Sequence, residues 1–91
     1  MNEMLAAVKK VMGITNDDFD TIINNYITAG IADLENVGIL PEKAVLTDAL
    51  VYSAVMSYVL SLLNTEYAEL YANAYALQKD ALRHYESYVV E

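Results

Sequence analysis

One histidine and one acid have the spacing of a catalytic pair. His84 is the only histidine, and Asp80 lies one helical turn before it, so a dyad could form on one helix face. The only nucleophile at helical spacing on that face is Ser87, and we expect the whole face to be exposed to solvent. The chain also lacks a phosphate-binding loop, an HExxH motif and a GxSxG motif. We therefore expect no catalytic residue, no cofactor and no enzyme activity.

A run of oxygen-bearing side chains begins at Asn16 and resembles part of a calcium-binding loop. In an EF-hand starting there, Thr21 would stand where glycine is required and Ile27 where glutamate is required, so we expect no metal site. The run fits a helix start better. Thr15 precedes Asp18 by three residues, as in a capping box, and acids stabilise a helix N-terminus. The acids expected on the surface are Asp17, Asp18 and Asp20.

The 91-residue chain carries 13 acidic and five basic side chains, a formal net charge of −8. Residues 1–46 hold seven acids and three bases, and residues 47–91 hold six and two, so each half has a charge of −4. Such a surface repels phosphate. This excludes a conventional DNA-binding domain, but not a protein past which DNA slides without sticking. A DNA mimic is disfavoured because the acids are scattered over several helix faces.

Length and composition indicate one domain spanning residues 1–91. Hydrophobic residues make up 56% of the chain, and a domain this small leaves much of its surface uncovered, so we expect apolar surface to remain for partners. Cysteine is absent, which excludes a disulfide framework and a thiolate metal site. The first 13 residues interleave acids and bases and do not resemble a signal peptide, so the default expectation is an intracellular protein.

Residues 48–63, DALVYSAVMSYVLSLL, carry the most informative pattern in the chain. Nearly every position is large and apolar except a narrow strip of small residues, and a helix that is apolar all round has to be buried. A membrane span takes about 20 residues with flanking bases, and this run offers neither. In so small a chain, burial on all sides indicates a helical part of an assembly. The strip consists of Ala49, Ser53, Ser57 and Ser61.

This strip of small residues would let two helices approach closely. It could pack within the subunit against the second predicted helix, through Gly30, or form a seam between subunits. Glycine costs about 1 kcal/mol relative to alanine in a helix interior, so we expect a neighbouring backbone to pass close to Gly30. Asp33 lies within the apolar arc of the second predicted helix and could either face a partner or be bonded inside the fold. The residues of this arc are Phe19, Ile22, Ile23, Tyr26, Ile27, Gly30 and Leu34.

Apolar periodicity predicts four helices, at residues 3–12, 17–36, 48–63 and 66–89. Residues typical of helix ends lie between them: Gly13, Gly38, Pro41, Thr47, Asn64 and Thr65. Thr47 and Thr65 are the expected N-caps of the last two helices, and Asn64 is expected in the left-handed closing conformation. The predicted fold is all-α, a compact bundle of about four helices with a buried apolar third helix and a long C-terminal helix.

Five of the eight tyrosines lie in the last predicted helix. Tyr67, Tyr71 and Tyr75 follow one another at intervals of four residues and form a ladder on one face. Tyrosine buries a large area while keeping a polar tip, which suits a core as well as a partly wet interface. The sequence leaves both interpretations open: the ladder completes the core, or it contacts another subunit or partner.

The order of these patterns resembles the small head–tail connector (adaptor) proteins of tailed phages. Those proteins commonly have a short first helix, a hydrophobic-x-x-acid-acid turn, and a long helix with paired aliphatics that ends in an acid, a glycine and an aliphatic residue. The matching positions are Ile14, Asp17, Asp18, Ile22, Ile23, Ile27, Glu35, Gly38 and Ile39. The later matches are Asp48, Leu50, Val51, Tyr58 and Val59, and a Leu-x-x-x-Leu-like element at slightly different spacing, Leu77 to Leu82.

The resemblance implies a structural role. Members of that family form a homo-oligomeric ring beneath the portal protein, join it to a tail-side completion protein, and leave a channel through which DNA passes without specific binding. It implies a location at the virion head–tail junction, and in the host cytoplasm during assembly, with no membrane partner. Identical subunits would pair head-to-tail and close into a ring.

Two sets of candidate residues accompany this interpretation. The subunit-interface candidates are Tyr67, Tyr71, Tyr75, Ser53, Ser57 and Ser61. Many relatives extend further beyond the last helix and use that segment to grip the portal, whereas this chain stops at Glu91. The portal-docking candidates are therefore Tyr85, Tyr88, Val89 and Val90. The alternative function is a small acidic helical binding module or regulator, acting as a dimer that lays its last helix against a partner.

Overall fold

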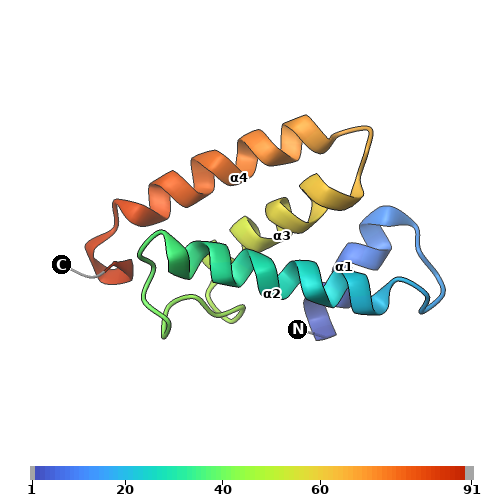
Figure 1. Ribbon diagram of the computed structural model, residues 1–91, viewed down its shortest axis with the longest axis horizontal. Helices are drawn as coiled ribbons and strands as arrows, with labels where there is room; N and C mark the ends of the chain where they lie inside the picture. The colour runs from blue at the N-terminus through green and yellow to red at the C-terminus, as the bar shows by residue number, and fades with distance from the viewer. Residues whose placement is uncertain (1, 90–91) are drawn as a thin grey trace.

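Figure 1 shows the computed structural model, which describes residues 2–89. The helices are α1 (Asn2–Met12), α2 (Asp20–Asn36), α3 (Ala49–Leu63) and α4 (Ala68–Arg83), followed by a 3-10 helix, η1 (Glu86–Tyr88). The predicted all-α bundle is confirmed. Among these residues, no helix has both the length and the apolar character needed to cross a membrane.

The central element is α3. α2 and α4 run along it on two sides, and α1 packs against both α2 and α3, which makes a body of 43 × 24 × 18 Å (Figure 1). Residues on several sides of α3 are buried: Val51, Ala54, Val55, Ser57, Val59 and Leu60. Leu50 and Leu62 nevertheless remain 49% and 48% exposed. The third helix is therefore the core helix, but a single subunit does not cover it on every side.

The buried face of α2 follows the predicted arc in its central part. Ile23, Ile27 and Leu34 are fully buried, and the spacing of these residues is that of one helix face. Phe19 and Ile22, expected on the same arc, are exposed instead. Phe19 lies just before the helix, where helical periodicity no longer determines the direction of its side chain.

The start of α2 differs from the prediction. The helix begins at Asp20 rather than at residue 17, and no side chain caps it, so the expected capping role of Thr15 is wrong. The Asn16 carboxamide oxygen accepts a hydrogen bond from the Asp18 amide at 3.0 Å. This local turn competes with the first helical turn and delays the helix by three residues.

The helix ends around α3 also correct the prediction. Asp48, not Thr47, is the N-cap, because one carboxylate oxygen accepts from the amides of Leu50 (2.9 Å) and Val51 (3.0 Å). Asn64 has an extended backbone (φ −94°, ψ 103°) rather than a left-handed one. The side-chain oxygen of Asn64, rather than that of Thr65, accepts a hydrogen bond at 2.9 Å from the amide of Tyr67, the N-cap residue of α4.

The fourth helix is shorter than predicted. It ends at Arg83, whereas apolar periodicity extended it to residue 89. His84 is its C-cap, Tyr85 is extended (φ −90°, ψ 117°), and the chain turns back towards the loop between α2 and α3. There the amide of Leu40 donates to the carbonyl of Tyr88 at 2.7 Å. Contacts distant in the sequence thus override the local periodicity.

Candidate functional site

The strip of small residues on α3 lies towards α4. Ser53 accepts a hydrogen bond from the Gln78 side-chain amide at 2.8 Å, and Ser57 is buried. The Ser57 and Ser61 hydroxyls donate to carbonyls of their own helix, those of Ser53 (3.2 Å) and Tyr58 (2.6 Å). Of the three serines predicted for a subunit interface, only Ser53 is exposed.

The predicted pairing of this strip with Gly30 is wrong. A Cβ atom at Gly30 would lie 3.0 Å from the Tyr58 ring and 3.3 Å from the Val55 side chain. Both residues belong to the side of α3 that contacts α2, away from the strip. Gly30 therefore accommodates side chains of α3, the Tyr58 ring above all, rather than the close-passing backbone that the sequence suggested.

The tyrosine ladder divides between the core and the surface. Tyr75 is 7% exposed and packs edge-to-face against Tyr58, with ring centroids 5.1 Å apart. Tyr71 is partly buried against the core, and Tyr67 is 50% exposed. The burial of Tyr75 favours the core interpretation for that residue. The interface prediction therefore applies chiefly to Tyr67 and Tyr71.

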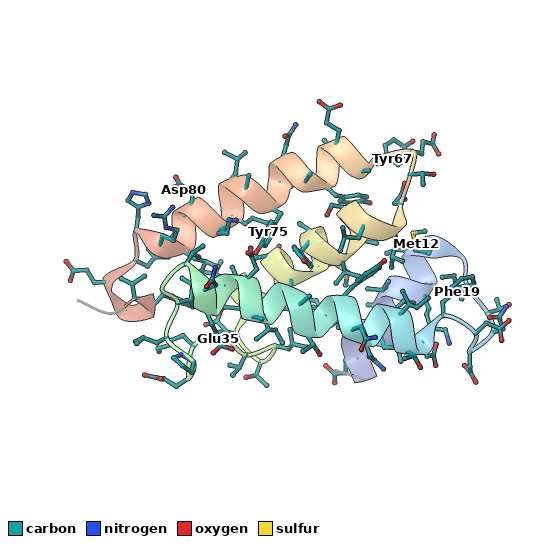
Figure 2. All side chains as sticks on the ribbon, viewed as in Figure 1. Met12, Phe19, Glu35, Tyr67, Tyr75 and Asp80 are labelled. Atoms are coloured by element: carbon teal, nitrogen blue, oxygen red, sulfur yellow. The ribbon has the colours of Figure 1, made fainter. Side chains whose placement is uncertain are left out.

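Asp33 is bonded inside the fold, a point that the sequence left open. Its carboxylate accepts from the Tyr75 hydroxyl at 2.5 Å and from the Lys79 ammonium at 3.3 Å. The ammonium also lies 5.0 Å from the centroid of the Tyr75 ring. Burial, together with the hydrogen bond to Asp33, raises the pKa of Tyr75 far above its usual range, so this hydroxyl stays protonated and remains a donor. Figure 2 shows Tyr75 reaching from α4 towards α2.

The residues predicted to dock on the portal occupy different environments. Tyr85 is about half exposed, whereas Tyr88 donates its hydroxyl to Asp48 at 2.6 Å. Val89 pairs with Ile39 in an isolated antiparallel bridge. Val90 lies outside the described residues. Two of the four candidates are thus already engaged within the subunit.

The Asp48–Tyr88 pair has perturbed proton affinities. Burial disfavours the charged form of Asp48, but hydrogen bonds from Tyr88, Val51 and Leu50 outweigh it, and the pKa of Asp48 lies below its usual value. The hydrogen bond to Asp48 and, secondarily, burial raise the pKa of Tyr88. Both shifts favour the state in which a neutral hydroxyl donates to a charged carboxylate.

A small, mainly apolar pocket of about 100 Å³ opens between the start of α3 and the end of α4. Its lining residues come from α3, from α4 and from the segment beyond it: Leu50, Ser53, Gln78, Ala81, Leu82 and Tyr85. Leu50 and Tyr85 are also among the exposed large apolar residues. This pocket adjoins the segment that turns back after α4.

The outer side of α4 carries exposed apolar residues that do not belong to the tyrosine ladder. Leu70 and Leu77 are 64% and 74% exposed, and they lie two helical turns apart on one side. The sequence contains a signal for this second surface. Apolar residues cover about 160° of the circumference of the last helix, which is wider than the roughly 100° stripe that one buried face requires. A second set of exposed apolar side chains lies on α1 and at the start of α2: Val11, Phe19 and Ile22.

The negative charges of the acidic residues around the start of α2 are partly neutralised by a lysine. The Lys9 ammonium lies 2.9 Å from a carboxylate oxygen of Asp17 and 2.9 Å from one of Asp20. Hydrogen bonds to these two carboxylates, that with Asp20 first, raise the pKa of Lys9. Asp18 is exposed. The predicted acidic surface therefore has two exposed acids, Asp17 and Asp18, and the partly buried Asp20, which shares Lys9 with Asp17.

The pair that could have formed a catalytic dyad does not have that geometry. His84 Nδ1 lies 2.7 Å from the backbone carbonyl of Asp80 and 4.0 Å from its carboxylate, and both residues are exposed. Ser87 is exposed as well. Within residues 2–89, no group of three or more His, Cys, Asp or Glu side chains is placed to hold a metal ion.

The chain was compared with known protein families, curated proteins and solved structures. The model of a family described as phage connector protein matches residues 4–85, from the first helix to two residues beyond the end of α4. No curated protein and no solved structure matches the chain.

Proposed function

Because this chain belongs to the phage connector protein family, we propose that it is the subunit of a homo-oligomeric ring beneath the portal protein. In this proposal the ring joins the capsid to a tail-side completion protein at the virion head–tail junction, after assembly in the host cytoplasm. DNA passes through its channel without specific binding. The observation that carries the proposal is the family match over residues 4–85, and the exposed apolar surface supports it.

The exposed apolar residues support head-to-tail pairing. Leu70 and Leu77 lie on α4, whereas Val11 and Phe19 lie on α1 and before α2. A head-to-tail contact joins two different surfaces of the same chain, and it closes into a ring when the rotation per subunit divides a full turn. Two separate apolar surfaces meet this requirement, whereas a symmetric dimer needs only one.

The charge of the chain supports free passage of DNA. With a net charge of −8 per subunit, a ring of identical copies carries a large negative charge, which disfavours binding of the phosphate backbone. Lys9 and Lys79 are held in ion pairs with acids of the same chain. Few bases are thus left to retain the DNA backbone.

The proposal is tested by measuring absolute mass in solution by light scattering, over a range of concentration and salt. A closed species of many copies, or its formation when portal protein is added, would support the ring. A dimer at all concentrations would instead support the small acidic binding module, with the outer side of α4 as its contact surface. A monomer that stays monomeric with portal present would contradict both functions.

A further inference from the structure

The loop between α2 and α3 holds the chain's own C-terminal segment, which consists of the 3-10 turn η1 (Glu86–Tyr88) flanked by the extended residues Tyr85 and Val89. Here "the arm" denotes residues 85–89 and "the receptor loop" denotes residues 39–48. The Leu40 amide donates to the Tyr88 carbonyl at 2.7 Å, and Ile39 forms an antiparallel bridge with Val89. In peptide recognition, backbone hydrogen bonds of this kind commonly give affinity and side-chain contacts give specificity.

Side chains of the receptor loop recognise the tyrosine of the arm. One oxygen of Asp48 accepts from the Tyr88 hydroxyl at 2.6 Å, while the other is held by the first amides of α3. The position of the carboxylate is therefore set by the helix and does not depend on Tyr88. The Lys43 ammonium lies 5.8 Å from the centroid of the Tyr88 ring, and Ile39 is fully buried. A hydroxyl acceptor, a cation and a buried aliphatic side chain together select a turn that ends in a tyrosine followed by an aliphatic residue.

The arm is less buried than the helix before it, although Tyr88 and Val89 pack against the core. No residue of η1 is buried, and Tyr85 is about half exposed. α4 has its own anchors, since Tyr75 and Leu82 are buried and do not depend on the arm. Segments with few buried groups open without global unfolding. The arm can therefore leave the receptor loop while the four-helix body stays folded.

We propose that the receptor loop is a binding site for a short turn that ends in a tyrosine followed by an aliphatic residue, filled by the chain's own arm in the isolated subunit and by the arm of a second copy in the assembly. This inference rests on the proposed ring. Because the copies are identical, an exchanged arm makes the same contacts as its own arm, so exchange loses none of them. The arm of each subunit then ties it to its neighbour.

Arm exchange constrains how neighbouring subunits lie. The segment from His84 to Tyr88, fully extended, spans at most about 17 Å. The receptor loop of one subunit must therefore lie within that distance of the end of α4 in the next. The pocket lined by Leu50, Leu82 and Tyr85 would lose Tyr85 when the arm leaves, and would then face this junction.

Cysteine cross-linking tests the exchange, and the absence of cysteine from the chain makes an introduced pair unique. Ile39→Cys and Val89→Cys are placed on separate full-length chains, which are mixed, assembled and oxidised. The expected result is an interchain disulfide when the assembled fraction is oxidised, and none when the mixed chains are diluted to the monomer before oxidation. A chain carrying both substitutions is the control, and as a monomer it should form the intrachain disulfide.

Light scattering on the same samples separates this inference from the ring itself. Suppose that rings form, but the double variant gives only intrachain disulfides and the mixed chains give no interchain disulfide. This result would overturn arm exchange and leave the proposed ring intact. Interchain disulfides in a species that never exceeds a dimer would support exchange and contradict the ring.

A second measurement avoids substituting the buried Ile39. In full-length Tyr88→Phe, the lost hydroxyl contact should speed hydrogen exchange of the Leu40 amide by about tenfold, since a hydrogen bond to a charged group contributes about that factor or more. Tyr85→Phe is the matched control and should leave the rate unchanged. A synthetic peptide of residues 84–89, added in excess to Tyr88→Phe, should restore the slow rate. Failure of the peptide to protect Leu40 would overturn the binding site.

Discussion

At the scale of single residues, polar contacts between distant parts of the chain hold the subunit together. Asp33 joins α2 to α4 through Tyr75 and Lys79, although both helices pack mainly on α3. Asp48 joins the start of α3 to the arm through Tyr88. In each case a carboxylate that interrupts an apolar pattern accepts a hydrogen bond from a tyrosine hydroxyl. Helical spacing cannot identify either tyrosine partner, because the two members of each pair are 42 and 40 residues apart in the sequence.

Tyr75→Phe tests the contribution of the first contact. The substitution keeps the ring and removes the hydroxyl that donates to Asp33, so we expect the free energy of unfolding to fall by about 1–2 kcal/mol. Urea denaturation followed by circular dichroism measures this loss. Tyr67→Phe, at a half-exposed position of the same helix face, is the control and should change stability by less than about 0.5 kcal/mol. Equal losses in the two variants would contradict the assignment.

The Asp48–Tyr88 contact should depend on pH at both extremes. The lowered pKa of Asp48 adds stability that is present above its ordinary value of 3.8 and is lost as the pH falls through the folded-state pKa. The raised pKa of Tyr88 adds stability that is present below its ordinary value of 10.0 and is lost as the pH rises through the folded-state pKa. The arm should therefore be held most firmly between pH 3.8 and 10.0.

The chemical shifts of the Val89 amide, followed by NMR during a pH titration, measure the position of the arm. They should stay constant across the middle of the range and move towards unstructured values below it. In Asp48→Asn the acid transition should disappear. An acid transition of the same size in that variant would assign it to another group.

At the scale of elements, the contact between α2 and α3 depends on the lack of a side chain at Gly30. A methyl group there would meet the Tyr58 ring at 3.0 Å, and this ring is itself packed edge-to-face on Tyr75. The ring cannot move away without disturbing the link between α2 and α4. Glycine at this position thus lowers helix stability, and the tight tertiary packing that it allows compensates for this loss.

Gly30→Ala should destabilise the fold despite its better helix propensity. Alanine gains about 1 kcal/mol as a helix former, but overpacking costs about 1–3 kcal/mol, so we expect a net loss of up to about 2 kcal/mol. Ala29→Gly, at the exposed neighbouring position, calibrates the propensity term. In a Tyr58→Ala background, Gly30→Ala should become stabilising. A stabilising effect in the wild-type background, measured by urea denaturation, would contradict the tight contact.

The two sides of α4 should respond differently to truncation. Leu82 is buried, so Leu82→Ala should cost about 2–5 kcal/mol of folding free energy. Leu77 is 74% exposed, so Leu77→Ala should leave folding within about 0.5 kcal/mol of wild type and reduce the assembled fraction seen by light scattering. Assembly that is unaffected by Leu77→Ala and by Leu70→Ala would remove the outer side of α4 from the subunit contact.

At the scale of the whole molecule, the acidic surface and the apolar side chains outside the core agree with the proposed ring through which DNA passes. The charge keeps copies soluble and phosphate at a distance, while the apolar residues outside the core give contacts for neighbours. Both properties belong to the whole chain and not to a single site.

The acidic surface predicts an absence of DNA retention. Duplex DNA should show no change in electrophoretic mobility with either the free or the assembled protein, at ionic strengths from about 0.01 M to 0.15 M. Retention that weakens steeply with added salt would reveal a basic surface formed by assembly and would contradict free passage.

Much of the subunit could be predicted from local pattern. Apolar periodicity located four helices, the central role of residues 48–63 and the buried positions Ile23, Ile27 and Leu34, because one face of a helix is recorded directly in residue spacing. The ordered motifs also indicated the family that the match over residues 4–85 confirms. These properties are local or depend on the order of patterns along the chain.

The tertiary structure decided what spacing cannot record. It ended α4 at Arg83, made Asp48 rather than Thr47 the cap of α3, and divided the tyrosine ladder between the core and the surface. The end of α4 and the division of the ladder depend on partners far away in the sequence, as when Tyr88 leaves the helical path to reach Leu40 and Asp48. The cap of α3 is local, but residue type alone does not choose between Thr47 and Asp48. Periodicity describes which side of a helix is apolar, but only the packed fold determines which part of that side is covered and which is left for another molecule.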